Sequence, residues 1–463
     1  MIWFIGGGCY HADMITLGAL KILKKADCIL YDHLVNRELL NYAPVECEKI
    51  NVGKIGHGSS YRQDDINKLL VGMGHKYHDV VRLKGGDPYL FGRGSEEMLY
   101  CLEHNLKCQY IPGISAAIGG LGFAGIPVTH RGLSSGFSVN TLHYQDGEDH
   151  IDYDLIKSNP NTQIFFMGAS RVRHLVDKCL EKGMDPDTTI TLASSLTYPS
   201  EKVLVSSLKD IKNEDIKDYK SPLLIVLGKT GMLHSKLDNT LNLEAYGKKI
   251  LLLSVDNTHW PIDTLLLEEG ITSHERQIAD IVYESHDNKD LNIYDELIFV
   301  SKNAVKGFIK YLKTRHMDIR SLCGKKILCV GYKTKEYLED MGIMADMTFD
   351  SSMELKNHIQ GKALWINGND VKNDEDSLSV YHFVSREFEI DDEYDAIGVS
   401  CPYSIEALHN CNISKEIPLF TFGHKSYFKA KELGFKNIYV TDNSKDALIK
   451  EMVRYLKEDK KDV

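Results

Sequence analysis

The chain has 463 residues, of which 43% are hydrophobic and 26% are charged, a composition typical of a globular protein with roughly two to four folding units. Its 55 Lys and Arg against 66 Asp and Glu give a net charge of −11, which argues against nucleic acid and anionic membranes as partners. No apolar run reaches the ~18 residues of a membrane span. Because the chain as a whole is acidic, an anionic substrate would need a local cluster of basic side chains.

The first half alternates strand-like apolar runs with helical patterns, which favours α/β units with largely parallel sheets. Helices are predicted at Ile15–Lys25, at Asp64–Gly74 and from about Ser95. The predicted strands are Ile2–Ile5, Cys28–Tyr31, Val80–Leu83, Ile164–Met167, Ile190–Ala193 and Leu223–Leu227.

A domain boundary is predicted between Met232 and Gly247, where a polar segment precedes a fresh apolar strand at Lys248–Val255. Val330–Leu338 and Phe422–Leu433 share the order strand, Gly, polar turn and helix, which indicates two similar lobes in the second half. The further predicted strands there are Leu297–Val300, Ile327–Val330, Ala363–Ile366, Ala396–Val399, Leu419–Phe422 and Ile438–Val440.

The ten cysteines are scattered and include no CxxC pair. This pattern predicts neither a disulfide framework nor a metal site, and it favours a reducing, cytoplasmic location.

The stretch Gly85–Gly94 places adjacent glycines, an Asp-Pro and an Arg between a predicted strand and a predicted helix. Glycine lets the backbone approach a ligand closely, and a helix start presents free N–H groups. By itself this pattern fits a ligand-binding loop and a ligand-free βα turn with about equal weight.

Other motifs shift this balance. VRLKGGDPYLFGRGSEE at Val81–Glu97 is accompanied by VGKIGH at Val52–His57, IPGISAA at Ile111–Ala117 and GIPVTHR at Gly125–Arg131. In this order and spacing they resemble the uroporphyrinogen-III C-methyltransferases of the tetrapyrrole methylase family, over about residues 1–237.

The resemblance implies a tetrapyrrole methylase fold of two α/β subdomains, about 1–113 and 114–240, with the active site between them. It also implies a homodimer formed through this half, and S-adenosyl-L-methionine as the cofactor, held without a Rossmann glycine loop. The cofactor-binding residues that it implies are Gly85, Gly86, Asp87, Leu90, Ser115, Ala116 and Met167.

The same resemblance assigns the chemistry of methyl transfer. Displacement at a sulfonium depends mainly on positioning, and a base helps the proton that must leave. Asp32 and Lys54 match positions with acid–base or orienting roles, and Arg93, His130 and Arg131 would bind the carboxylates of the tetrapyrrole. Taken singly, Asp32 could instead cap a turn, Lys54 could be solvated, and Arg93 could pair with a neighbouring Glu.

The second half resembles uroporphyrinogen-III synthase, a two-lobed α/β family. The resemblance rests on YDELIFVSKNAVKGF at Tyr294–Phe308, GKKILCVGYKTKEYLEDMG at Gly324–Gly342 and DAIGVSCPYSIEAL at Asp395–Leu408. It implies a domain at 248–463 whose lobes are about 248–279 plus 385–463, and 280–384. The chemistry would be cyclisation of hydroxymethylbilane.

Tyr381 would assist departure of the hydroxyl in that cyclisation, although it could also be an aromatic residue of an interlobe strand. The residues implied to bind substrate carboxylates are Ser301, Asn303, Thr334 and Ser400, together with Lys302.

The leading hypothesis is a bifunctional enzyme that makes uroporphyrinogen III and methylates it at C2 and C7 to precorrin-2, for sirohaem or cobalamin. One alternative keeps the methylase fold but acts on another corrinoid precursor, or on RNA or protein. Another is a tetrapyrrole-binding protein with degenerate sites and a vestigial synthase half. It is motivated by Gly6–Asp13, GGGCYHAD, where the family has a Pro-Gly-Asp triplet.

Overall fold

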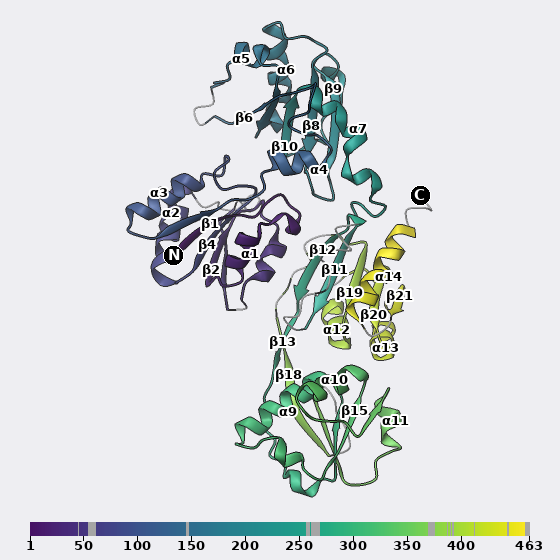
Figure 1. Ribbon diagram of the computed structural model, residues 1–463. Coiled ribbons are helices and arrows are strands. Elements are labelled where there is room, and N and C mark those ends of the chain that lie inside the picture. Colours follow the sequence, from purple (N-terminus) through teal and green to yellow (C-terminus); the bar gives the residue numbers. More distant parts are fainter. Residues whose placement is uncertain are drawn as a thin grey trace.

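The computed structural model describes residues 1–44, 46–53, 62–144, 148–255, 260, 269–368, 376–386, 388, 390, 393–411, 413–441 and 444–458. These residues form four β-sheets, each with its own helices, and thus four α/β units, of which the fourth is inserted between β12 and β19 of the third (Figure 1). None of the helices in the described ranges is long and apolar enough to cross a bilayer.

The first sheet is wholly parallel, with strand order β3-β2-β4-β1-β5. Its strands are β1 (Ile2–Gly6), β2 (Cys28–Tyr31), β3 (Glu48–Asn51), β4 (Val80–Lys84) and β5 (Cys108–Ile111). Its helices are α1 (Leu17–Leu23), α2 (Gln63–Lys76) and α3 (Gly94–Glu103), with a 3₁₀ helix at Arg37–Tyr42. The strands expected here from apolar runs are confirmed to within a residue.

Helices cover both faces of this sheet because successive strand residues point to opposite sides. Ile2 and Phe4 of β1 pack with α2 and α3, whereas Ile5 packs with α1. Thr16 caps α1 by accepting a 3.2 Å hydrogen bond from the Ala19 N–H. Burial on both faces explains why β4 is buried along its whole length.

The second sheet has strand order β6-β7-β10-β8-β9. Its strands are β6 (Phe137–Thr141), β7 (Thr162–Phe166), β8 (Thr189–Ser194), β9 (Lys202–Ser207) and β10 (Leu223–Leu227). Its helices are α4 (Leu121–Phe123), α5 (Tyr153–Ser158), α6 (Val172–Glu181) and α7 (His234–Leu237).

The expectation of largely parallel sheets is wrong for this second sheet. Among its described strands β6 and β7 pair in parallel, whereas β7–β10, β10–β8 and β8–β9 are antiparallel. Residues 195–201 connect β8 to β9 without a helix, so the chain turns straight back. A parallel pair would need a longer crossover.

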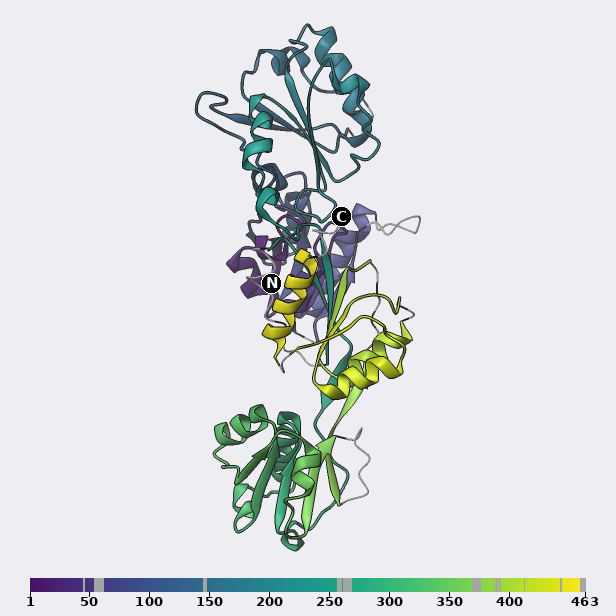
Figure 2. The ribbon, with the colours of Figure 1, turned by 90° about the vertical axis from the view of Figure 1, so that its right-hand side faces the viewer.

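The second half contains the third and fourth sheets. The third, β12-β11-β19-β20-β21, is parallel and is built from β11 (Lys249–Ser254), β12 (Thr272–Gln277), β19 (Ala396–Val399), β20 (Leu419–Phe422) and β21 (Ile438–Thr441). The fourth, β13-β18-β17-β14-β15-β16, contains β13 (Ala279–Val282), β14 (Glu296–Phe299), β15 (Lys326–Val330), β16 (Met347–Phe349), β17 (Ala363–Gly368) and β18 (Ser377–Ser385). Both views show the antiparallel β13–β18 pair running between the two units (Figures 1 and 2).

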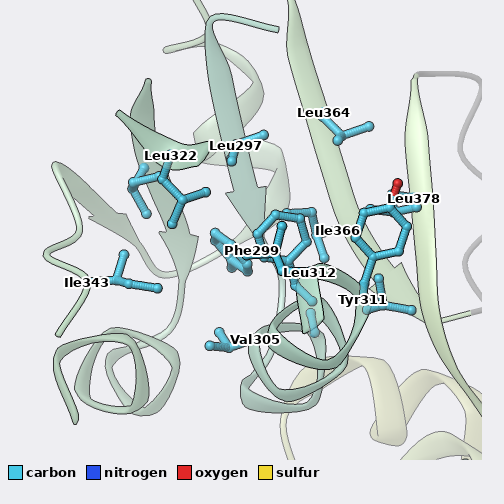
Figure 3. Packing of buried hydrophobic residues seen from close by; sticks show 14 of the residues in the cluster. Leu297, Phe299, Val305, Tyr311, Leu312, Leu322, Ile343, Leu364, Ile366 and Leu378 are labelled. Atoms are coloured by element: carbon cyan, nitrogen blue, oxygen red, sulfur yellow. The ribbon is translucent and has the colours of Figure 1, made fainter. Parts of the chain in front are cut away.

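The helices of the second half pack on both faces of its sheets. Those of the third sheet are α12 (Pro402–Asn410), α13 (His424–Glu432) and α14 (Lys445–Glu458), and those of the fourth are α9 (Lys302–Thr314), α10 (Tyr332–Asp340) and α11 (Ser352–Lys356). In the fourth unit, Val305 and Leu312 of α9 pack against Phe299 of the sheet (Figure 3). Each such buried side chain contributes roughly 1.5–3 kcal/mol.

The internal repeat is confirmed in backbone geometry. Gly331 follows β15 with φ 82° and ψ 143°, and Gly423 follows β20 with φ 81° and ψ 148°. Each glycine precedes a nine-residue helix. A positive φ of this kind favours glycine, so the same turn recurs in both lobes.

Candidate active site

The carboxyl ends of β1, β4 and β5 meet at three glycines. A Cβ added to Gly113 would lie 2.0 Å from the Gly86 carbonyl oxygen, and one added to Gly6 would lie 2.4 Å from the Gly113 Cα. Gly86 and Gly8 exchange backbone hydrogen bonds of 2.8 and 3.2 Å. Only glycine permits this approach, and ligands of parallel α/β sheets bind at this edge.

A cavity of about 670 Å³ opens at this edge, between the first and second sheets. This volume is typical of small-molecule sites. The structure brings into it every residue that the resemblance implied for the cofactor: Gly85, Gly86, Asp87, Leu90, Ser115, Ala116 and Met167. They come from both subdomains, and their role as cofactor contacts stays a prediction.

Asp87 organises the loop after β4. Its Oδ2 accepts hydrogen bonds from the Tyr110 hydroxyl at 2.6 Å and the Gly113 N–H at 3.0 Å, and its Oδ1 accepts one from the Tyr89 N–H at 2.8 Å. Burial and this hydrogen bond raise the pKa of Tyr110. The carboxylate therefore fixes the cavity wall in addition to lining it.

Strained backbone accompanies the cavity wall. Met167, which lines the cavity, has φ 56°, and Ser195 and Thr197, on either side of the lining residue Leu196, have φ 52° and 66°. A side chain in the left-handed region costs on the order of 1 kcal/mol and persists only where surrounding contacts impose it. Such conformations are concentrated at functional sites.

Asp32 is held in an ion cluster at the end of β2. Arg82 donates from Nη2 to Asp32 at 2.5 Å and from Nε to Glu97 at 2.9 Å. Lys84 lies 3.3 Å from Asp32 and 3.0 Å from Glu97. Burial opposes the charge of Arg82, but the carboxylates of Asp32 and Glu97 raise its pKa overall.

Sequence reasoning missed Arg82, Lys84 and Glu97, although two charged residues in the apolar strand Val80–Lys84 were a usable signal. Charges on a strand buried on both faces must be paired. The cluster contains two cations and two anions, so it is balanced.

Other predicted residues of the first half lie away from the cavity. Arg93 is the N-cap of α3, and its exposed guanidinium forms a 2.7 Å ion pair with Glu96, as one of the alternatives held. His130 and Arg131 are exposed on a turn closed by hydrogen bonds between His130 and Ser134. Lys54 falls outside the described residues. Roles for these residues in binding the tetrapyrrole stay predictions.

The divergent loop Gly6–Asp13 also contributes to the cavity. Tyr10 stacks on Tyr198 with ring centroids 3.8 Å apart. Its hydroxyl lies 3.2 Å from Nε2 of His274, a residue of the second half. Burial raises the pKa of Cys9 to about 11, so its thiol remains protonated near neutral pH. Sequence reasoning did not find Tyr198 or His274 because no local motif connects them to this loop.

Contacts are recorded among several of the predicted residues of the second half. The Tyr381 hydroxyl lies 3.4 Å from Ser301 Oγ, which caps α9 by accepting from the Ala304 N–H at 3.1 Å. The Tyr283 hydroxyl donates to Asn303 at 2.9 Å, and its ring lies 6.3 Å from that of Tyr381.

The two remaining positions are Thr334 and Ser400. Thr334 is buried in α10 of the fourth unit, whereas Ser400 follows β19 in the third. Lys302 is the first residue of α9, next to Ser301. The catalytic and carboxylate-binding roles in this half stay predictions.

No group of three or more His, Cys, Asp or Glu side chains within the described ranges is placed to hold a metal ion. The chain is thus a multidomain α/β protein whose first half has a small-molecule cavity at the carboxyl edge of a parallel sheet, between two subdomains.

Comparison with known proteins identifies the family. The profile described as Tetrapyrrole (Corrin/Porphyrin) Methylases matches residues 1–212, and that described as Uroporphyrinogen-III synthase HemD matches residues 262–374. The chain belongs to the tetrapyrrole methylase family and carries a HemD-family segment in its second half. It is therefore a two-part protein of tetrapyrrole biosynthesis.

Individual relatives match one or both halves. The chain is 30% identical to the porphyrin biosynthesis protein HemD of Ruminiclostridium josui, over 74% of this chain and 70% of that protein. It is 38% identical to the uroporphyrinogen-III C-methyltransferase of Methanocaldococcus jannaschii, over 48% of this chain and 93% of that protein. It spans about half the length of the siroheme synthase of Pseudoalteromonas atlantica (35% identity, 51% of this chain, 52% of that protein).

Among solved structures, the uroporphyrin-III C-methyltransferase of Thermus thermophilus complexed with S-adenosylhomocysteine is 32% identical. The match covers 50% of this chain and 97% of that one, with a TM-score of 0.44.

Proposed function

We propose that the first half transfers methyl groups from S-adenosyl-L-methionine to C2 and C7 of uroporphyrinogen III, giving precorrin-2. The observation that carries the proposal is the convergence of all seven predicted cofactor residues on one cavity of about 670 Å³. The similarity to a named uroporphyrinogen-III C-methyltransferase over 93% of its length supports the same activity.

The cavity fits such a cofactor. Gly86 has φ 65°, and the nearest atom to an added Cβ is the Ser115 Cα at 3.9 Å, so its free face looks into open space. When bound, the cofactor supplies an electrophilic methyl group. The chain's own residues hold the substrate carbon in line with it, which is where most of the acceleration of such a reaction arises.

Asp32 is the candidate base for the proton released by the methylated pyrrole. Arg82 and Lys84 fix its carboxylate at the end of β2, and 29% of its side chain remains exposed. A carboxylate that is fixed but accessible can accept a hydrogen bond from a pyrrole N–H and orient the ring. Its neighbours His33 and Leu34 line the cavity.

For the second half we propose cyclisation of hydroxymethylbilane to uroporphyrinogen III. The support is the HemD-family match at residues 262–374 and the proximity of the Tyr381 and Ser301 hydroxyls. A phenol at this position can donate a proton to the departing hydroxyl of the substrate. The second half would then make uroporphyrinogen III, and the first half would consume it.

A second candidate is tetrapyrrole binding without methylation. The stack of Tyr10 on Tyr198 favours it, because both residues line the cavity and the usual Pro-Gly-Asp triplet is absent from this loop. The family resemblance further suggests a cytoplasmic homodimer formed through the first half, which sedimentation in solution would test.

The deciding experiment incubates the protein with hydroxymethylbilane and isotope-labelled S-adenosyl-L-methionine, and identifies the pigments by mass. Dimethylated product supports both proposed activities. Uroporphyrinogen III without label leaves only the synthase, and methylation of added uroporphyrinogen III without cyclisation leaves only the methylase. Tight binding of uroporphyrin III with neither product identifies the second candidate.

A further inference from the structure

The two halves are joined by a specific polar contact, in addition to their linker. Glu38, in the 3₁₀ helix of the first half, accepts a 2.7 Å hydrogen bond from the Glu275 backbone N–H and forms a 2.7 Å ion pair with Arg276. Asn41 donates to the Glu275 carbonyl at 3.5 Å. The Glu38 and Arg276 side chains are only 12% and 18% exposed. Strand β12 is therefore anchored to the first half.

A second cavity, of about 880 Å³, lies between the two halves. Among the described residues that line this cavity, Glu406 is the acidic one. Its carboxylate forms a 2.8 Å ion pair with Lys429. The basic residues that line the cavity are Arg37 and Lys49 from the first half and Arg276 and Arg386 from the second. Positive charge therefore predominates on its wall.

The charges of this wall are not all balanced within the protein. Asp280 holds Arg386 in a two-pronged contact, with both bonds at 2.6 Å. Lys49 has no carboxylate within ion-pair distance among the described residues. Partial desolvation by the surrounding protein and the positive charge of Arg386 lower the pKa of Lys49, although its side chain remains exposed on β3. A bound carboxylate would relieve this crowding of cations.

This second cavity, here called the inter-half cavity, adjoins the cavity of about 670 Å³ in the first half, here called the methylase cavity. Arg37 and Arg276 line both of them, and His274 of β12 also reaches the methylase cavity. A planar guanidinium can grip a carboxylate through two parallel hydrogen bonds. One anionic molecule could therefore move from one cavity to the other while its carboxylates stay in contact with the shared residues Arg37 and Arg276.

We propose that the inter-half cavity binds the carboxylate side chains of the tetrapyrrole released by the second half, and delivers it to the methylase cavity. Arg37, Lys49, Arg276 and Arg386 are the contacts. The ligand class is a polycarboxylate macrocycle, for which a basic cavity of about 880 Å³ is suited in both charge and size. The proposal rests on the proposed function, since the second half must make what the first half consumes.

The test is charge reversal at Lys49, because its side chain has no ion pair that the change would break within the described part of the chain. Binding of uroporphyrin III, a stable octacarboxylate analogue, is followed by fluorescence. Lys49→Glu should weaken it on the order of 10- to 100-fold, as expected for loss of a charged contact. Lys21→Glu, on the exposed face of α1, makes the same change in net charge and should bind like wild type.

The second measurement is the coupled reaction from hydroxymethylbilane with the full-length protein. For each variant, the amount of unmethylated uroporphyrinogen III released is divided by the rate at which that variant methylates uroporphyrinogen III supplied from solution. This ratio should be higher for Lys49→Glu than for Lys21→Glu. If the wild type is active and the two variants bind and release alike, the cavity proposal is overturned. If Lys49→Glu alone binds uroporphyrin III more weakly but none of the three proteins makes product, the proposed function fails while the binding site stands.

Discussion

Replacing Glu97 with Gln tests the ion cluster beneath the candidate active site. The Glu97 carboxylate lies 2.9 Å from Arg82 and 3.0 Å from Lys84, and all three side chains are at most 4% exposed. The variant leaves two buried cations facing Asp32 alone. Breaking a buried pair by removing one partner costs roughly 3–5 kcal/mol.

The assay is hydrogen exchange of the β4 amides, which pair with β1 and β2. A loss of 3–5 kcal/mol corresponds to exchange faster by roughly two to four powers of ten. Glu96→Gln is the matched control, because Glu96 pairs with Arg93 on the surface and should contribute less than about 1 kcal/mol. If the two variants exchange at similar rates, the cluster does not stabilise this sheet and the argument from burial is wrong.

Three further outcomes are expected. Gly86→Val should abolish S-adenosyl-L-methionine binding in calorimetry, because the side chain enters the cavity. The control Gly132→Val also replaces a glycine of positive φ (86° against 65° at Gly86), but on an exposed turn, and should keep binding; retained affinity in both variants would remove the Gly86 loop from the site. Tyr381→Phe should slow cyclisation about 10²–10⁴-fold with the fold intact, and an unchanged rate would leave Tyr381 a packing role beside Phe383. Burial raises the pKa of Glu201 from 4.5 to about 7. Between these pH values the folded state holds a proton that the unfolded state releases. The free energy of unfolding should therefore fall as pH rises from 4.5 to 7, by at most about 3 kcal/mol. Glu201→Gln keeps an acceptor for the Thr197 N–H and should remove that fall in melting experiments at pH 5 and 8; a wild-type slope in the variant would contradict the assignment.

The sequence determined the local elements and the glycine-rich loops. Apolar runs such as Leu223–Leu227 locate buried strands because burial on both faces demands continuous apolar residues. Gly85 and Gly86 mark a close backbone approach that only glycine allows, and the structure places them in a cavity with the other predicted cofactor residues. These features depend on short-range sterics and burial, which a local pattern records.

Only the tertiary structure decided which distant side chains meet. The antiparallel pairing of β8 with β10 depends on connections that the apolar pattern does not specify. Arg93 has the residue type and loop position of a carboxylate ligand, yet its guanidinium lies against Glu96. The Glu38–Arg276 contact joins residues 238 positions apart, across two halves that local motifs describe separately. Charge pairing acts through space, so its partners are fixed by the packing of whole units and not by any spacing along the chain.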